Sequence, residues 1–260
     1  MQRDRQSKRW LILILGVVLI GFARCGGEDG KDDGADAEIV DEIISTQITG
    51  QADDADSTTP ADRYTGPGDL DAEDQRTKSS SVQPTFEEVA GKAEAESLDP
   101  SANTVTGDEA VATSFNKVVS RLRVARNGSF TFDIELGVDG VELRHDGTVM
   151  IQVAAAILDD QGVSVPAGGI ANITFEFRKN EGDSTDVIIA GDEDNPENPD
   201  ADGDYTRTLS GPSGGVTLPP GNYRLEFDLR ITARAPVLVG DDGQRHRAAV
   251  EAAKATIELQ

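Results

Sequence analysis

The stretch YRLEFDLRIT, residues 223–232, decides the fold class of this 260-residue chain. Every second residue in it is apolar, and these residues are Tyr223, Leu225, Phe227, Leu229 and Ile231. Successive side chains of a β-strand point to opposite faces of a sheet, so a period of two predicts a strand with one buried and one solvent-exposed face. The same alternation over Phe130–Val138 predicts a second strand.

Five more segments have strand character, and they are Val118–Ala125, Val149–Leu158, Ile170–Arg178, Tyr205–Leu209 and Arg247–Leu259. The last one begins with an alanine-rich stretch that fits either a short helix or a bulged strand. Asn127-Gly128 tolerates the positive φ of a tight turn, so we expect a hairpin between the strands on either side of it. Seven strands without a long amphipathic helix predict an all-β fold, an antiparallel two-sheet sandwich over residues 116–260.

The residues Leu218-Pro219-Pro220-Gly221-Asn222-Tyr223 run directly into the longest predicted strand. This segment resembles the LPPGxY turn-to-strand signature of bacterial Ig-like and fibronectin-III-like domains, and the strand pattern of residues 116–260 is similar to theirs. The resemblance implies an Ig-like sandwich. The Cys–Trp–Cys core of antibody domains is absent, because the only tryptophan is Trp10 and the only cysteine is Cys25.

Upstream of the predicted sandwich, residues 26–115 contain 23 acidic and 5 basic residues and few aromatic ones. Such a composition buries too little apolar surface to offset the entropy of ordering, so we expect a mostly disordered acidic tether. Within it, the apolar spacing of Ala37–Ile44 and the capping-box pattern of Thr85–Glu96 predict transient helices. A segment that docks onto a partner is the alternative for Ala37–Ile44.

The first 25 residues have the layout of a secretory signal, with a basic start, an apolar run over Trp10–Ala23 and then Cys25. As a helix the run would span about 21 Å, which is shorter than the roughly 30 Å hydrocarbon core of a bilayer. A cleaved signal therefore fits better than a permanent span. We expect the rest of the chain to be exported from the cytoplasm.

The residues Phe22-Ala23-Arg24-Cys25 resemble the lipobox of bacterial lipoproteins. The resemblance implies that Cys25 is lipidated and becomes the mature N-terminus of a membrane-anchored protein in the cell envelope. Gly26 is compatible, by the same resemblance, with the outer membrane of a two-membrane bacterium, and the periplasm is the other location. Arg24 stands where the family has Gly, Ala or Ser, so an uncleaved N-terminal anchor remains the alternative. A single cysteine excludes an internal disulfide.

A loop over residues 180–204 is the strongest candidate for a binding site, because acidic and amide side chains crowd its second half. Ca²⁺ takes six to eight oxygen ligands, which closely spaced Asp and Asn side chains supply. Residues 198–203 match the first half of an EF-hand loop, but Leu209 stands where its bidentate Glu would be, so a full EF-hand is excluded. The candidate ligands are Asp192, Asp194, Asn198, Asp200, Asp202 and Asp204. A plain solvated acidic loop is the alternative.

Residues suited to catalysis are few. His145 and His246 lie in polar, charged segments, so we expect both to be exposed on loops. Gly211-Pro212-Ser213-Gly214-Gly215 matches G-x-S-x-G, but that motif activates serine only on a strand-to-helix turn, so a glycine-rich loop is the better interpretation. We therefore predict no catalytic residue.

The formal net charge of −24 disfavours binding to nucleic acid or to anionic lipid. The sequence predicts a non-enzymatic, membrane-anchored envelope lipoprotein whose sandwich binds an envelope protein or glycan, or has a structural role. The alternative is a calcium-dependent binding module, hydrolase or lyase that uses the loop 180–204. A further alternative is an envelope-assembly protein that pairs an edge strand with a partner chain. The strand Tyr223–Arg234 alternates charges on its solvent-exposed face, which normally protects against such pairing if the strand is an edge.

Overall fold

The computed structural model describes residues 36–53, 68–71, 77–96, 109–179, 185–190, 198–211, 215–236 and 246–260. The chain divides into two compact units, Met1–Asp33 and Gly34–Gln260, and every described residue belongs to the second. The predicted signal and the lipobox-like residues up to Cys25 lie outside the described residues.

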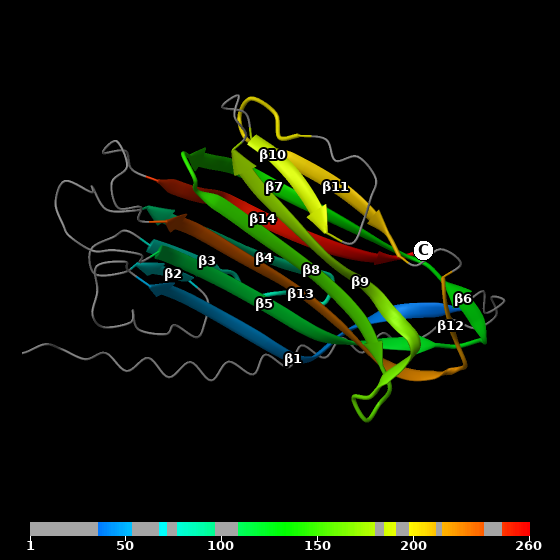
Figure 1. Ribbon diagram of the computed structural model, residues 1–260. Helices are drawn as coiled ribbons and strands as arrows, with labels where there is room; N and C mark the ends of the chain where they lie inside the picture. The colour runs from blue at the N-terminus through cyan, green and yellow to red at the C-terminus, as the bar shows by residue number, and fades with distance from the viewer. Residues whose placement is uncertain are drawn as a thin grey trace, which may run out of the picture. The chain divides into compact units, whose positions relative to one another are not determined.

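Two antiparallel six-stranded sheets make up the described unit (Figure 1). Sheet A has the order β1-β5-β13-β8-β9-β10, with β1 Ala37–Asp53, β5 Glu109–Val124, β13 Gly221–Pro236, β8 Thr148–Leu158, β9 Ser164–Lys179 and β10 Thr185–Ala190. Sheet B has the order β11-β7-β14-β4-β3-β2, with β11 Tyr205–Ser210, β7 Phe132–Arg144, β14 Arg247–Leu259, β4 Glu88–Glu96, β3 Thr77–Ser81 and β2 Gly68–Asp71. A small third sheet pairs β12 Val216–Leu218 with β6 Gly128–Phe130. The predicted all-β antiparallel sandwich is confirmed.

The core consists of the inward-facing residues of both sheets, which alternate with outward-facing ones along each strand. Its largest fully buried side chains are Phe132, Phe175, Phe177, Phe227, Leu122, Ile134, Leu136, Ile151, Ile157, Leu218, Leu225 and Leu229. Burying a side chain of this size contributes roughly 1.5–3 kcal/mol. The core therefore holds the two sheets together without a disulfide.

All seven predicted strands are present, and the alanine-rich start of Arg247–Leu259 is a bulged strand. The Leu218–Tyr223 turn is closed by the Tyr223 hydroxyl, which donates to the Pro219 carbonyl oxygen at 2.8 Å. A tyrosine that bonds back to the backbone before its own strand is a feature of Ig-like sandwiches. The strand that follows, β13, is central, because it pairs with β5 on one side and β8 on the other. Tyr223–Arg234 is therefore not an edge strand.

The predicted tether over residues 26–115 is wrong wherever the structure describes it. Residues 37–53 form β1, residues 77–96 contain β3 and β4, and β5 begins at Glu109. Small apolar side chains of this segment, such as Ala93 and Ala95, are completely buried. The high proportion of acidic residues over these ninety positions led to the wrong prediction, because strands that contribute only Ala, Val and Ser to a core need few large apolar residues.

The two predicted helices are strands. Ala37–Ile44 belongs to β1, whose β-branched residues favour a strand because their side chains are stiff at χ1. Two register shifts, between Val40 and Ile43 and between Ile43 and Ser45, give this half of β1 the spacing that suggested a helix. Thr85–Glu96 begins with a turn in which Thr85 and Glu88 exchange backbone hydrogen bonds of 3.0 and 3.4 Å, and it continues as β4.

The hairpin predicted at Asn127-Gly128 is also wrong. The strand before it, β5, lies in sheet A, whereas β7 after it lies in sheet B, so the chain crosses between the sheets here. Gly128 has no positive φ and instead opens the short strand β6, which pairs with β12. Turn-type residues raise the probability of a local turn but do not determine which strands pair.

Candidate functional site

The described part of the acidic loop, residues 198–204, is a tight turn that satisfies its own backbone. Asp200 N–H donates to the Asp204 carbonyl oxygen at 2.9 Å, and Gly203 N–H donates to the Asp200 carbonyl oxygen at 3.1 Å. One carboxylate oxygen of Asp200, Oδ1, accepts the N–H groups of Asp202 at 2.9 Å and Asp204 at 3.0 Å. Asp200 therefore acts as a local cap, the usual role of an aspartate in a turn. Asp192 and Asp194 lie outside the described residues.

This turn is held against β7 at close range. Val141 N–H donates to the Gly203 carbonyl oxygen at 3.0 Å, and Gly140 N–H donates to Oδ1 of Asp204 at 3.1 Å. Gly203 has a φ of +88°, and a Cβ there would lie 2.6 Å from the Val141 carbonyl oxygen. Only glycine permits both this conformation and this approach.

Asn198 connects the turn to the edge of sheet A. Its Oδ1 accepts the N–H of Val187 in β10 at 3.3 Å, and its Nδ2 donates to Oδ1 of Asp186 at 3.3 Å. Both polar ends of the amide are thus engaged by β10. Three of the predicted calcium ligands, Asn198, Asp200 and Asp204, thus lie on this turn, and Oδ1 of each accepts one or two backbone N–H groups.

The turn docks where β7 and β14 both change the face that they bury, a feature that sequence reasoning missed. On β7 the buried positions run through Val138 and resume at Val141, and on β14 they run through Val250 and resume at Ala253. The pairing of the two strands keeps one register across both interruptions, whereas β14 shifts against β4 there. Beside these two interruptions lies a hollow of about 610 Å³ between the turn and sheet B. The sequence signal was the break in alternation at Asp139-Gly140.

Carboxylates surround the interruptions of β7 and β14. A hydrogen bond with the Asp204 carboxyl, followed by the charge of Asp204, raises the pKa of Asp139 above its ordinary value, and the charge of Glu251 raises it further. Gly140, with a φ of +62°, makes room for Glu251, because a Cβ at this position would lie 2.6 Å from its Cγ. Asp139 is fully exposed, so water screens these interactions. Asp139 and Asp204 are both accessible to solvent.

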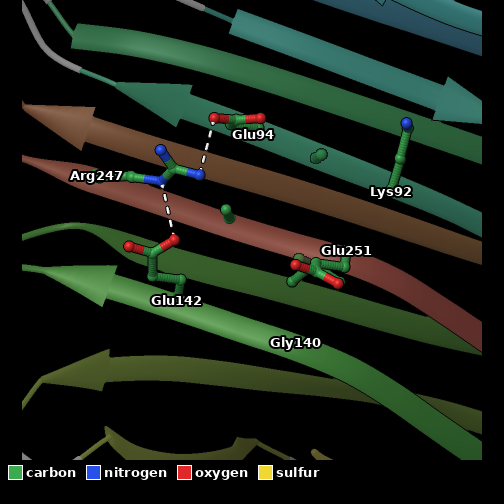
Figure 2. A pocket seen from close by; sticks show the side chains of 9 residues that line it. Lys92, Glu94, Gly140, Glu142, Arg247 and Glu251 are labelled. Atoms are coloured by element: carbon green, nitrogen blue, oxygen red, sulfur yellow. Dashed lines mark ion pairs between the residues drawn. The ribbon is translucent and has the colours of Figure 1, made fainter. Parts of the chain in front are cut away.

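A neighbouring hollow of about 370 Å³ lies on the outer face of sheet B, over β4, β14 and β7. Figure 2 shows Arg247 between Glu94 and Glu142, at 3.1 and 3.3 Å, with Lys92 and Glu251 farther along the same face. The guanidinium thus joins the two strands on either side of β14. Opposite charges in this hollow largely neutralise one another, so it offers neither a strongly acidic nor a strongly basic ligand site.

The histidines differ from each other in burial. His145 is exposed, as predicted, but His246 is 2% exposed, so the prediction for it is wrong. Its Nδ1 accepts the N–H of Asp146 at 3.1 Å, and the two imidazole rings meet edge to face at 5.6 Å. Close packing of the turn explains this burial, since a Cβ on Gly147 would lie 1.9 Å from the Arg247 carbonyl oxygen. The tertiary fold, not the charged sequence around it, buries His246.

Two further features concern possible chemistry. Ser213 of the G-x-S-x-G match lies outside the described residues, and the segment joins β11 to β12. Within the described ranges, no three His, Cys, Asp or Glu side chains gather so that they could hold a metal ion. The calcium ligands therefore stay a prediction that depends on Asp192 and Asp194.

In the part of the chain that the structure describes, no helix has the length and apolar character that a membrane crossing needs.

Comparison with known proteins adds a weak structural likeness. No family model matches the sequence, and no curated protein matches it. The structure is similar to the adhesin domain of Epf from Streptococcus pyogenes, with 11% sequence identity and a TM-score of 0.28. The alignment covers 83% of this chain and 58% of the adhesin domain's chain. This chain therefore spans less than two thirds of the length of the adhesin domain's chain. A TM-score this low does not establish a common fold, and the likeness carries no argument about function.

Proposed function

We propose that this chain is a non-enzymatic, membrane-anchored lipoprotein of the cell envelope whose β-sandwich serves a binding or structural role. The observation that carries the proposal is the position of Cys25, the only cysteine in the chain, directly after a basic start and a short apolar run. A lone thiol at this position has an evident use in lipid attachment and none in an internal disulfide.

The arrangement of ionisable groups supports the non-enzymatic part. Carboxylates that act in acid–base catalysis usually lie in a desolvated site, where burial and neighbouring charges together tune their pKa values. At the interruptions of β7 and β14, Asp139 is fully exposed, and Asp200 and Asp204 are exposed residues that accept backbone N–H groups. Among the described residues the calcium-dependent alternative has no favouring geometry, because no three His, Cys, Asp or Glu side chains gather there so that they could hold a metal ion.

Metabolic labelling of the full chain tests the anchor. The chain is expressed in a bacterium with lipoprotein-processing enzymes, grown with an alkyne-bearing fatty acid, and the mass of the N-terminal peptide is measured. Wild type should carry the label at Cys25, and Cys25→Ser should lose the label.

Arg24→Gly is the informative companion variant, because it restores the small residue of the family's motif. Label that appears only in Arg24→Gly, while wild type stays in the membrane with residues 1–24 attached, would replace lipidation by the uncleaved anchor. Wild type recovered unlabelled from the soluble fraction would refute anchoring altogether.

A further inference from the structure

Among the described residues, β1 forms one margin of sheet A, and its second half is a regular edge strand. Among the described strands, β1 pairs with β5 alone, and Figure 1 shows it (blue) at the margin of the sheet beside β5. The register from Ser45 to Asp53 is unbroken over nine residues. An edge strand presents a row of backbone N–H and C=O groups that can pair with another strand.

The other described edges carry features that limit such pairing. On β10, Asn198 caps the N–H of Val187. The edges β2 and β11 comprise only four and six residues. The first half of β1 has two register shifts and the acids Glu38, Asp41 and Glu42. Short length, bulges and charge are the usual protections of an edge, and the stretch 45–52 has none of these.

The composition of residues 45–52 indicates which strand fits there. The sequence Ser-Thr-Gln-Ile-Thr-Gly-Gln-Ala contains no ionisable side chain, in a chain of net charge −24. A second copy presents the same neutral strand, so two copies meet here without opposing charges. When residue 45 of one copy lies opposite residue 51 of the other, side chains of the same face meet, and Asp53 falls opposite Ile43 and not opposite an acid. Like charges directly opposite each other in a sheet would destabilise the pair.

We propose that residues 45–52 of β1 pair antiparallel with the same residues of a second copy of this chain. The two-fold contact is isologous, because each strand meets its own counterpart. It joins the six-stranded sheet A of each copy into one continuous sheet. This contact does not depend on Cys25 or on the identity of any ligand.

The test measures the mass of the full chain in mild detergent by light scattering over a range of protein concentrations. Hydrogen exchange of a peptide covering residues 45–53 is followed at the lowest and highest concentration. The edge variant is Gln47→Lys with Thr49→Lys, which brings four lysines together in the dimer. The matched control is Thr206→Lys with Thr208→Lys, two exposed positions on the edge strand β11. Circular dichroism confirms that each variant is folded.

We expect a wild-type dimer in which exchange of residues 45–53 slows as concentration rises. The edge variant should weaken dimerisation at least about tenfold, since like-charge juxtaposition costs 1.4 kcal/mol or more, and the control should not. A wild-type monomer at the highest concentration overturns the proposal. So does a dimer that leaves residues 45–53 unprotected, or protection that appears only when other envelope proteins are added. If the edge variant does not fold, the wild-type exchange data alone decide the outcome.

Discussion

Replacing Gly203 by alanine tests whether the acidic turn is held on β7 by a close backbone approach. The φ of +88° costs an L-residue about 1–2 kcal/mol. The new Cβ would lie 2.6 Å from the carbonyl oxygen and 2.8 Å from the nitrogen of Val141, and neither backbone atom can move aside as a flexible side chain would. The turn must therefore shift, which breaks the 3.0 Å hydrogen bond from Val141 N–H to the Gly203 carbonyl oxygen. That bond is worth about 0.5–1.5 kcal/mol net.

Together these effects predict that Gly203→Ala lowers the free energy of unfolding by about 2–3 kcal/mol. The assay is urea denaturation of the full chain in detergent, followed by circular dichroism, where a loss of this size moves the midpoint by about 1 M. The amides of Gly140 and Val141, which donate to the turn, should also exchange at least about tenfold faster.

Gly169→Ala is the matched control. A Cβ at Gly169 meets nothing within 4 Å, and the φ of Gly169 is not positive. The free energy of unfolding should therefore change by less than about 0.5 kcal/mol in Gly169→Ala. Equal midpoints for Gly203→Ala and Gly169→Ala would refute the argument that the turn is held by this contact.

The buried side-chain amide of Asn116 donates to the Val82 carbonyl oxygen at 2.9 Å and to the Ala90 carbonyl oxygen. Asn116→Ala should therefore lower the free energy of unfolding, measured by urea denaturation, by about 2–3 kcal/mol. Asn172 is exposed, so the control Asn172→Ala should lower it by less than about 0.5 kcal/mol. Burial raises the pKa of Asp228 above its ordinary 3.8 although neighbouring cations oppose the shift, so its protonated form stabilises the fold below pH 3.8 and that contribution is lost as pH rises through the raised pKa. Asp228→Asn should therefore raise Tm by about 1–2 °C at pH 7 and leave it unchanged near pH 3. A lower Tm of the variant at pH 7 would show that the ionised carboxylate stabilises the fold, against this reasoning. A melt with Ca²⁺ or Mg²⁺ at matched ionic strength should give equal Tm values, and a calcium-specific rise, lost in Asp200→Asn, would show that the loop binds calcium.

The sequence by itself determined the fold class and seven of the fourteen described strands. The alternation of residues 223–232 is local and long, and both faces of a strand are defined by it regardless of which strands lie beside it. It also identified the acidic turn, because Asp200 and Gly203 are turn residues by their own backbone chemistry. These features depend on neighbours along the chain.

Only the tertiary structure decided which strands pair and what each pairing buries. Residues 37–53 and 88–96 are strands because β5 and β14 provide the hydrogen bonds and the buried face that their own small side chains do not predict. His246 is buried because Gly147 lets a distant turn approach its strand. The interruptions of the buried pattern on β7 and β14 coincide because these two strands lie opposite each other. Each of these outcomes depends on contacts between residues far apart in the chain, and such contacts leave no local period in the sequence.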